Sequence, residues 1–342
     1  MHRPLRLTID RKAIQANWRW LQDRAGVIAG AAVKADGYGL GARETTEALI
    51  EAGCRDFFVS TWAEAEALGN LPPDVSLVVL HGVGPDDAEA ALRIGARPCL
   101  NTIEQVARWR EIAPSQPCDV MIDTGMNRLG LRPTEIGALD GLAIETLHSH
   151  LACADEDSAL NQMQLERFRA VAGAVVAKRY SFANSAGICL GPDYAFDLTR
   201  PGLALYGGVP RREAEGHIRQ VARIEAEIVQ RRRIEPGDSV GYNATFTAKR
   251  RHELAILNIG YGDGYLCGFS GTGRARIGDG FAPVVGRVSM DLTALCVDGA
   301  PQLAEGDWVE LDYDLPVASA QSGLTQYELL TTLSARFERI WR

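Results

Sequence analysis

Residues 56–68 read Asp-Phe-Phe-Val-Ser-Thr-Trp-Ala-Glu-Ala-Glu-Ala-Leu, a short apolar run followed directly by a helix-like segment. The run Asp56–Ser60 has the length and the aromatic and β-branched residues that are typical of a buried strand. Thr61 precedes Glu64 by the spacing of a helical capping box, so Trp62–Leu68 is predicted to be a helix. A strand that leads directly into a capped helix is the repeating unit of α/β folds.

The same unit recurs between residues 26 and 207. Further strand-like runs are Val27–Val33, Val75–Leu80, Arg97–Leu100, Asp119–Asp123, Ile144–Ser149, Tyr180–Ala183 and Leu198–Leu205. Helices are predicted at Pro85–Ile94, Thr102–Ile112 and Asn161–Val176, and Asn101–Glu104 repeats the cap spacing. Eight strand–helix units in about 200 residues predict a (β/α)8 TIM barrel, and a doubly wound open sheet is the alternative.

After about residue 215 the pattern changes to that of a smaller, mainly antiparallel β domain. Val221–Gln230 alternates apolar and polar residues, and Gly-Asp turns follow at 237–238, 278–279 and 306–307. The charged stretch Pro210–Gly216 is the predicted boundary, which gives a barrel over residues 1–215 and a β domain over 216–342. The segment Leu5–Ile9 also alternates, so residues 1–10 are candidates to pair with the second domain.

The composition is that of an ordinary globular protein of 342 residues with a net charge of −8, which does not favour a nucleic-acid partner. No apolar stretch is long enough for a membrane span, and Met1–Leu5 lacks the apolar core of a secretory signal. The seven cysteines include no C-x-x-C pair, so neither a disulfide framework nor a metal site is predicted. We therefore expect a cytoplasmic protein.

Polar residues stand where the predicted strands end, which is where TIM barrels carry their active sites. These residues are Lys34, Arg128, His150, Asn184, Ser185, Arg200 and Gly202. Lys34 follows a buried run, so burial should lower its pKa, as formation of a Schiff base requires. A lysine that extends from the strand end into solvent is the alternative, and position alone does not distinguish the two.

Two segments near these strand ends could hold an anion. Gly37, Gly39 and Gly41 indicate either a phosphate loop or a flexible turn, because they lack the dinucleotide and P-loop spacings. Ser185 with Gly202 falls after the seventh and eighth strands, the usual place of a barrel's phosphate site. An ordinary helix cap is the alternative for Asn184 and Ser185.

Taken in order, the motifs of this chain resemble those of the alanine racemases, which are fold-type III pyridoxal-phosphate enzymes. The resemblance covers nearly the whole chain and rests on seven segments: Val33–Gly39, Asp123–Gly130, His148–His150, Ala183–Ala186, Arg200–Gly207, Val240–Thr245 and Gly286–Asp291.

The resemblance implies a role for each matching residue. Lys34 would carry pyridoxal 5'-phosphate and act as the base on one face of the substrate, and Tyr242 of a second subunit would act on the other face. His150 and Arg200 would form the hydrogen-bonded chain that prepares Tyr242, with Arg200 also facing the pyridine nitrogen. The remaining implied cofactor contacts are Tyr38, Asn184, Ser185, Gly202, Leu203 and Tyr327. The implied substrate contacts are Arg128 and Met290, and the implied entrance residues are Asp155, Tyr261 and Arg287.

Two departures from the family pattern fall near the implied substrate site. Met121 stands where the family often has a carbamylated lysine that bridges to the arginine, so Arg128 must be held by another group, such as chloride or a neighbouring side chain. Cys267 replaces an entrance arginine, which leaves Asp155 without its usual partner.

The expected function is the interconversion of L- and D-alanine by a homodimer, either in biosynthesis of D-alanine for cell-wall peptidoglycan or in catabolism. Alternatives are a racemase of another small amino acid such as serine, an amino-acid decarboxylase or aldolase, and a non-catalytic pyridoxal-phosphate carrier. A nicotinamide oxidoreductase is more distant, because the dinucleotide motif is missing.

Overall fold

The computed structural model describes residues 2–342, so the first residue of the segment Met1–Leu5 lies outside the described chain. The chain divides into two compact units. One comprises residues 14–205 and 209–219, and the other comprises the residues up to 13 together with 206–208 and 220–342. Within residues 2–342 we find no helix with both the length and the apolar character of a membrane span.

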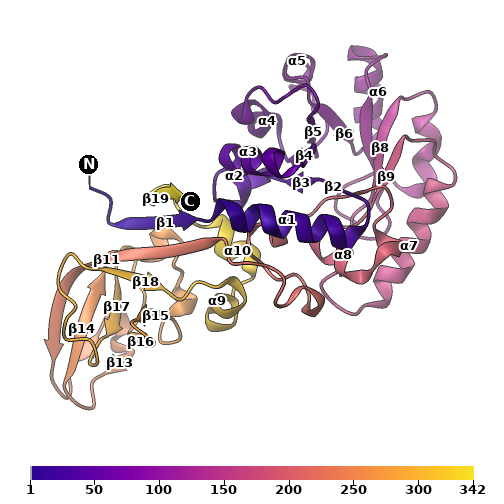
Figure 1. Cartoon of the computed structure of the whole chain (residues 1–342). Coiled ribbons are helices and arrows are strands. Elements are labelled where there is room, and N and C mark those ends of the chain that lie inside the picture. Colours follow the sequence, from indigo (N-terminus) through magenta and orange to yellow (C-terminus); the bar gives the residue numbers. More distant parts are fainter. Residues whose placement is uncertain (1) are drawn as a thin grey trace. The chain divides into compact units, whose positions relative to one another are not determined.

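The first unit is a closed parallel barrel (Figure 1). Its first strand is split at Gly30 into β2 (Ile28–Ala29), which pairs with β10 (Leu198–Thr199), and β3 (Ala31–Ala32), which pairs with β4 (Asp56–Val59). The split strand therefore joins both edges of the sheet, which confirms the (β/α)8 barrel and excludes the open sheet. The other strands are β5 (Ser76–Val79), β6 (Arg97–Leu100), β7 (Cys118–Met121), β8 (Ile144–His148) and β9 (Arg179–Ser181).

Gly30 is required at the split for a steric reason. A Cβ atom at this position would lie 2.7 Å from the backbone oxygen of Asp56 on the neighbouring strand. Inside the barrel, side chains from five strands form one apolar cluster of Phe58, Val78, Cys99, Met121 and Leu198. Apolar side chains therefore fill much of the barrel interior.

The helices of the barrel are α1 (Arg11–Ala25), α2 (Lys34–Tyr38), α3 (Ala42–Ala52), α4 (Trp62–Leu68), α5 (Ala88–Arg93), α6 (Ile103–Ile112), α7 (Ala159–Ala172) and α8 (Ser185–Leu190). The sequence predicted α4, α5, α6 and α7, which begin within three residues of their predicted starts, and it did not predict the other four. Thr61 and Glu64 form the predicted capping box of α4. The predicted cap of α6 is wrong by one residue. Thr102 accepts the hydrogen bond from the Gln105 amide, whereas the Asn101 side chain donates to the carbonyls of Leu80 and Cys99.

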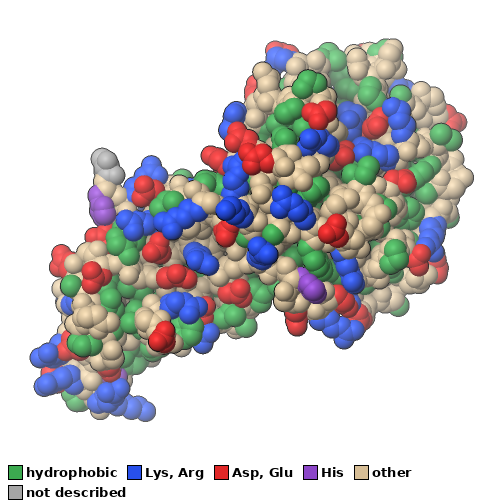
Figure 2. All heavy atoms as spheres, in the orientation of Figure 1, with side chains coloured by type: hydrophobic (Ala, Val, Ile, Leu, Met, Phe, Trp, Pro, Cys, Tyr) green, Lys and Arg blue, Asp and Glu red, His purple; other side chains and the backbone are tan. Residues whose placement is uncertain are grey.

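The second unit is an antiparallel sheet in the order β14-β17-β16-β15-β18-β11-β1-β19, in which only β1 and β19 run parallel. Its strands are β1 (Leu5–Ile9), β11 (Ala222–Ile234), β14 (His252–Leu257), β15 (Arg274–Ile277), β16 (Gly280–Val285), β17 (Thr293–Cys296), β18 (Trp308–Leu311) and β19 (Glu338–Trp341). The hairpin of β12 (Ser239–Val240) and β13 (Phe246–Thr247) and the helices α9 (Leu315–Ser322) and α10 (Gln326–Thr331) complete it. On the face drawn in Figure 2, acidic and basic side chains are interspersed over most of the surface.

Candidate active site

Lys34 lies two residues after β3 and begins α2, in which the backbone forms a left-handed turn and not a regular α-helix. Ala35, Asp36 and Tyr38 all have positive φ angles, of 53°, 51° and 55°, and two glycines of the same turn also have positive φ. A non-glycine residue in this conformation costs about 1–2 kcal/mol. Such strain is typical of functional sites and persists only where surrounding contacts enforce it.

Two carboxylates enforce the turn. Glu64 Oε1 accepts a hydrogen bond from the amide of Ala35 at 2.8 Å, while its other oxygen accepts from the amide of Ser60 at 2.6 Å. Asp36 Oδ1 accepts from the amide of Ala42 at 2.9 Å. Glu64 therefore completes the capping box of α4 and also fixes the backbone of Ala35, the residue after Lys34.

The Lys34 side chain is half-buried, and its pKa lies below the ordinary lysine value. Burial is the main cause, and the positive charges of Arg128 and Arg200 add to it, while the negative charge of Glu64 opposes it. A lower pKa leaves more of the amine uncharged near neutral pH, as nucleophilic attack on a carbonyl group requires.

A buried polar chain of Arg97, Asp119, His148 and Arg200 runs through the barrel. Arg97 Nε donates to Asp119 at 3.0 Å, and His148 Nε2 lies 2.9 Å from the other oxygen of this carboxylate. Arg200 Nη1 lies 3.2 Å from His148 Nδ1. Because Arg97 begins β6 and Arg200 follows β10, the chain connects the amino end of the barrel with its carboxyl end.

The hydrogen bonds determine the charge state of each group in this chain. Arg200 donates to Nδ1 of His148, so the imidazole proton is on Nε2 and is donated to Asp119. Burial lowers the pKa of His148 to about 4, against the pull of Asp119, so the ring is neutral. Burial opposes ionisation of Asp119, but its hydrogen bonds with His148 and Arg97 outweigh this and hold its pKa low. Burial lowers the pKa of Arg200 to about 10, which leaves it charged.

His150 extends this chain toward the mouth of the barrel. Its Nδ1 atom lies 3.5 Å from Arg200 Nη2, and the same nitrogen of Arg200 donates to the Ser149 carbonyl at 2.6 Å. Burial, with the positive charges of Arg200, Arg128 and Lys34, holds the pKa of His150 well below its usual value. The predicted pair of His150 and Arg200 is thus brought together, with a neutral imidazole next to a charged guanidinium.

Tyr38, Ser185 and Gly202 meet at the carboxyl ends of the strands. A Cβ at Gly202 would lie 2.1 Å from the Tyr38 hydroxyl, so any other residue there would displace the tyrosine side chain. Ser185 Oγ accepts from the amides of Gly202 at 2.9 Å and Ala204 at 3.3 Å. Asn184 caps α8 by accepting from the Gly187 amide, and Leu203 is buried at the start of a 3-10 turn.

Arg128 is exposed at the end of a tight loop. Asp123 Oδ1 accepts from the amides of Gly125, Met126 and Asn127 at 2.8, 2.9 and 3.1 Å, and so fixes the loop that carries the arginine. Met121 packs in the apolar cluster of the barrel and offers Arg128 no charged partner. Asp155, the predicted entrance residue of the barrel, is exposed.

In the β unit, glycines bring three loops into backbone contact. A Cβ at Gly241 would lie 3.2 Å from the Arg287 amide nitrogen, and a Cβ at Gly260 would lie 2.5 Å from the Met290 oxygen. The Tyr261 amide donates to the Ser289 carbonyl at 3.0 Å. The predicted residues of this unit, Tyr242, Tyr261, Arg287 and Met290, therefore lie on one group of loops.

These loops expose apolar surface. Tyr242 is 70% exposed, Met290 52% and Tyr261 40%, which is unusual for large side chains. Tyr242 begins a turn in which Asn243 and Ala244 have positive φ. Cys267, in place of the family's arginine, is exposed and donates weakly to the Val288 carbonyl at 3.7 Å. Tyr327 lies on α10 and is partly exposed.

Four residues that support this site were not singled out from the sequence: Glu64 as a turn anchor, Asp119, Asp123 and Arg97. Asp119 has the clearest sequence signal, because a carboxylate inside an apolar strand needs a buried partner. Glu64 was recognised only as a cap residue, and its second hydrogen bond becomes visible only once the strands are side by side.

A (β/α)8 barrel with a lysine of lowered pKa at the end of its first strand, followed by an antiparallel β domain, is the architecture of a fold-type III pyridoxal-phosphate enzyme. Residues 9–210 match the family described as alanine racemase, N-terminal domain, and residues 221–341 match alanine racemase, C-terminal domain. The chain therefore belongs to the alanine racemase family.

Individual relatives resemble the chain over nearly its whole length. The alanine racemase of Acidiphilium cryptum is 42% identical over 349 residues, covering 98% of each chain. The biosynthetic alanine racemase of Agrobacterium fabrum is 40% identical, covering 98% of this chain and 93% of its own length. The crystal structure of alanine racemase from Bartonella henselae with covalently bound pyridoxal phosphate has a TM-score of 0.92 at 34% identity, covering 99% of both chains.

Proposed function

We propose that the chain interconverts L- and D-alanine with pyridoxal 5'-phosphate bound at Lys34, and that Lys34 and Tyr242 are its two proton-transferring groups. The observation that carries the proposal is the environment of Lys34, where burial and neighbouring positive charges lower the pKa of an amine held by a strained turn. The bound cofactor supplies an electron sink for the pair released at Cα.

The residues around Lys34 fit this cofactor. The Tyr38 hydroxyl packs against Gly202, whose amide donates to the Ser185 hydroxyl, so the hydroxyls of Tyr38 and Ser185 are the groups that would donate to its phosphate. Arg200 is held by the carbonyl of Ser149 and by His148, so it can donate to the pyridine nitrogen but not protonate it. We assign the remaining cofactor contacts to the residues that the resemblance implies. We likewise place Arg128 and Met290 near the substrate carboxylate.

Racemisation needs one group on each face of Cα. In the direction from L- to D-alanine, the Tyr242 phenolate takes the α-proton on one face while the Lys34 ammonium gives its proton to the other. Each turnover in this direction leaves Tyr242 protonated and Lys34 deprotonated, so Tyr242 must lose its proton to solvent and Lys34 must take one up before the next turnover. His150 and Arg200 would orient the tyrosine through hydrogen bonds.

We further propose that Tyr242 acts in the site of a second copy of this chain, so that the active unit is a homodimer. Exposed Tyr242, Met290 and Tyr261 form a surface that a partner would cover. A cytoplasmic location fits the seven free cysteines of the described chain, because thiols persist in a reducing compartment.

Mixing two inactive variants tests both parts of the proposal. Lys34→Ala lacks the amine, and Tyr242→Phe lacks the phenol, but a dimer of one copy of each has one site with both defects and one intact site. After random subunit exchange we expect about a quarter of the wild-type activity to return. Exchange is followed independently with two differently tagged copies. If exchange occurs and the mixture stays inactive, Tyr242 does not act across subunits.

A further inference from the structure

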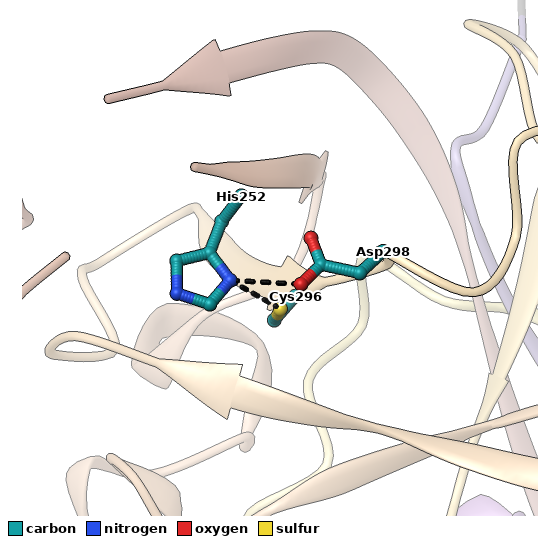
Figure 3. Close-up of side chains that lie close together, drawn as sticks. All are labelled: His252, Cys296 and Asp298. Atoms are coloured by element: carbon teal, nitrogen blue, oxygen red, sulfur yellow. Dashed lines mark hydrogen bonds and ion pairs between the residues drawn. The ribbon is translucent and has the colours of Figure 1, made fainter. Parts of the chain in front are cut away.

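Three side chains in the β unit converge on one point (Figure 3), and none of them is a residue assigned to catalysis. His252 Nδ1 lies 2.9 Å from Asp298 Oδ2 and 3.4 Å from Cys296 Sγ. The three donor atoms all lie within 4.8 Å of one another. We propose that His252, Cys296 and Asp298 form a binding site for a divalent cation that accepts nitrogen, sulfur and oxygen ligands, with Zn²⁺ as the best match.

The sheet places the three ligands rigidly. Strands β14 and β17 are antiparallel neighbours in the register Leu254↔Cys296, and the Val297 amide continues the pairing by donating to the Glu253 carbonyl at 2.8 Å. His252 and Asp298 therefore stand opposite each other, and Cys296 is two residues along on the same face. Asp298 is fixed further because its second oxygen accepts from the Glu253 amide at 2.7 Å.

The distances match tetrahedral zinc. With Zn–N of about 2.05 Å, Zn–O of about 2.0 Å and Zn–S of about 2.3 Å, neighbouring ligand atoms lie about 3.3–3.6 Å apart. The observed separations from His252 Nδ1, 2.9 and 3.4 Å, need only small shifts to reach these values. Three protein ligands with water in the fourth position is a common zinc arrangement.

Asp298 hydrogen-bonds with both His252 and Cys296, which keeps the three ligand atoms together. A single ring nitrogen has either one proton or one lone pair, so Nδ1 of His252 cannot fully satisfy both Cys296 and Asp298. The arrangement is also not a proton relay, in which the acid and the nucleophile contact opposite ring nitrogens. A cation between the three atoms would use one lone pair of each. Binding would move the imidazole proton to Nε2 and release the thiol proton of Cys296 to solvent.

The positive charges of nearby arginines would weaken cation binding, and Arg250 also contacts one of the ligand atoms. Arg250 Nη2 lies 3.0 Å from Asp298 Oδ2, the same oxygen that faces His252. Its side chain is 72% exposed, so moving it into solvent costs little. Arg233 and Arg251 are paired with Glu253 and Glu235, which reduces their repulsion. The sequence predicted no metal site, because the ligands come from strands 44 and 46 residues apart and follow no short motif.

Zinc titration of the purified holoenzyme by calorimetry tests the site. We expect one Zn²⁺ per chain, a higher melting temperature with zinc, and one sulfur among the ligands in the X-ray absorption spectrum of the bound metal. Cys296→Ser and His252→Gln should each weaken binding by about 100-fold or more, because even groups that only orient a metal ligand contribute 10- to 100-fold. Asp298→Asn keeps the side-chain shape and should also weaken zinc binding. It therefore tests the site even if Cys296→Ser or His252→Gln does not fold.

Two control variants separate this site from adventitious binding. Cys267→Ser removes an exposed thiol elsewhere and should leave zinc affinity unchanged. Arg250→Gln removes the competing cation and should raise affinity by up to about fivefold, the usual strength of an exposed ion pair. The proposal is overturned if zinc does not saturate at one per chain, if the absorption spectrum contains no sulfur ligand, or if folded Cys296→Ser binds zinc as the wild type does.

Discussion

The guanidinium of Arg200 donates a hydrogen bond to Nδ1 of His148 across 3.2 Å, and both side chains are buried inside the barrel. No carboxylate contacts Arg200 directly within residues 2–342, and Asp119 acts on it through the imidazole. The arginine therefore keeps its charge while its position is set by a neutral group. This relationship makes the stability of the barrel depend on the protonation of His148.

Stability should fall when the pH is lowered from about 6.5 to about 4. The unfolded chain protonates His148 near pH 6.5, whereas the folded chain does so only near its lowered pKa of about 4. Below pH 6.5 protons therefore favour unfolding, and His148 alone should lower the free energy of unfolding by about 3 kcal/mol over this range. Urea unfolding at a series of pH values measures this dependence.

His148→Gln is the matched control for this pH dependence. Glutamine can donate to Asp119 and accept from Arg200 but does not titrate. Its unfolding free energy should have a shallower slope between pH 6.5 and 4, with the slope due to His150 retained. An unchanged slope would show that His148 is already protonated in the folded barrel.

Gly202→Ala should lower both the stability of the protein and its retention of cofactor, and a second substitution should separate the two effects. The new methyl would lie 2.1 Å from the Tyr38 hydroxyl, so this side chain must move, at a cost of about 1–3 kcal/mol in stability. We also expect weaker retention of pyridoxal phosphate, measured as visible absorbance after dialysis. Adding Tyr38→Phe should restore part of the stability but not the retention. If the double variant also retains the cofactor fully, the Tyr38 hydroxyl does not contribute to phosphate binding.

Asp123→Ala should raise KM for alanine with little change in bound cofactor. Removing the carboxylate leaves three amides of the Arg128 loop without their acceptor, so the arginine loses its fixed position. Asp123→Asn is the control, because its amide oxygen can still accept these bonds. Steady-state kinetics in both directions, with cofactor content measured on the same samples, tests this. Equal loss in both variants would indicate that the charge of Asp123, and not the loop geometry, matters.

The sequence was sufficient to predict the barrel because its strands and four of its helices carry their own local signals. The apolar run Asp56–Ser60 and the cap at Thr61 need no distant partner to be recognised, and the observed β4 and α4 agree with them. Asn101 shows the limit of such local patterns. Its spacing to Glu104 matched a cap, but the side chain bonds to the carbonyls of Leu80 and Cys99, and Leu80 directly follows the neighbouring strand β5.

The parts of the site that were missed depend on contacts between distant segments. The left-handed turn after Lys34 includes Ala35, a residue that does not favour positive φ, and it is held by hydrogen bonds from Ala35 to Glu64 and from Ala42 to Asp36. The link from Asp119 to His148 likewise crosses from β7 to β8. It was predictable that polar residues at the strand ends lie close together, because the topology of the barrel alone brings them there. The hydrogen-bond partners of these residues were not predictable.

The two proposed bases should each serve one enantiomer. If Tyr242 removes the proton of L-alanine and Lys34 that of D-alanine, Tyr242→Phe should keep exchange of the α-proton with deuterated water for D-alanine and lose it for L-alanine. A general base contributes about 10²- to 10⁴-fold, which sets the size of the expected difference. Lys34 remains in this variant, so the cofactor stays bound and its visible absorbance serves as the internal control. Because Tyr242 is 70% exposed on its own chain, the substitution should not change the unfolding free energy of the subunit appreciably. Equal loss of exchange for both enantiomers would mean that a single base reaches both faces, or that Tyr242 only shapes the site.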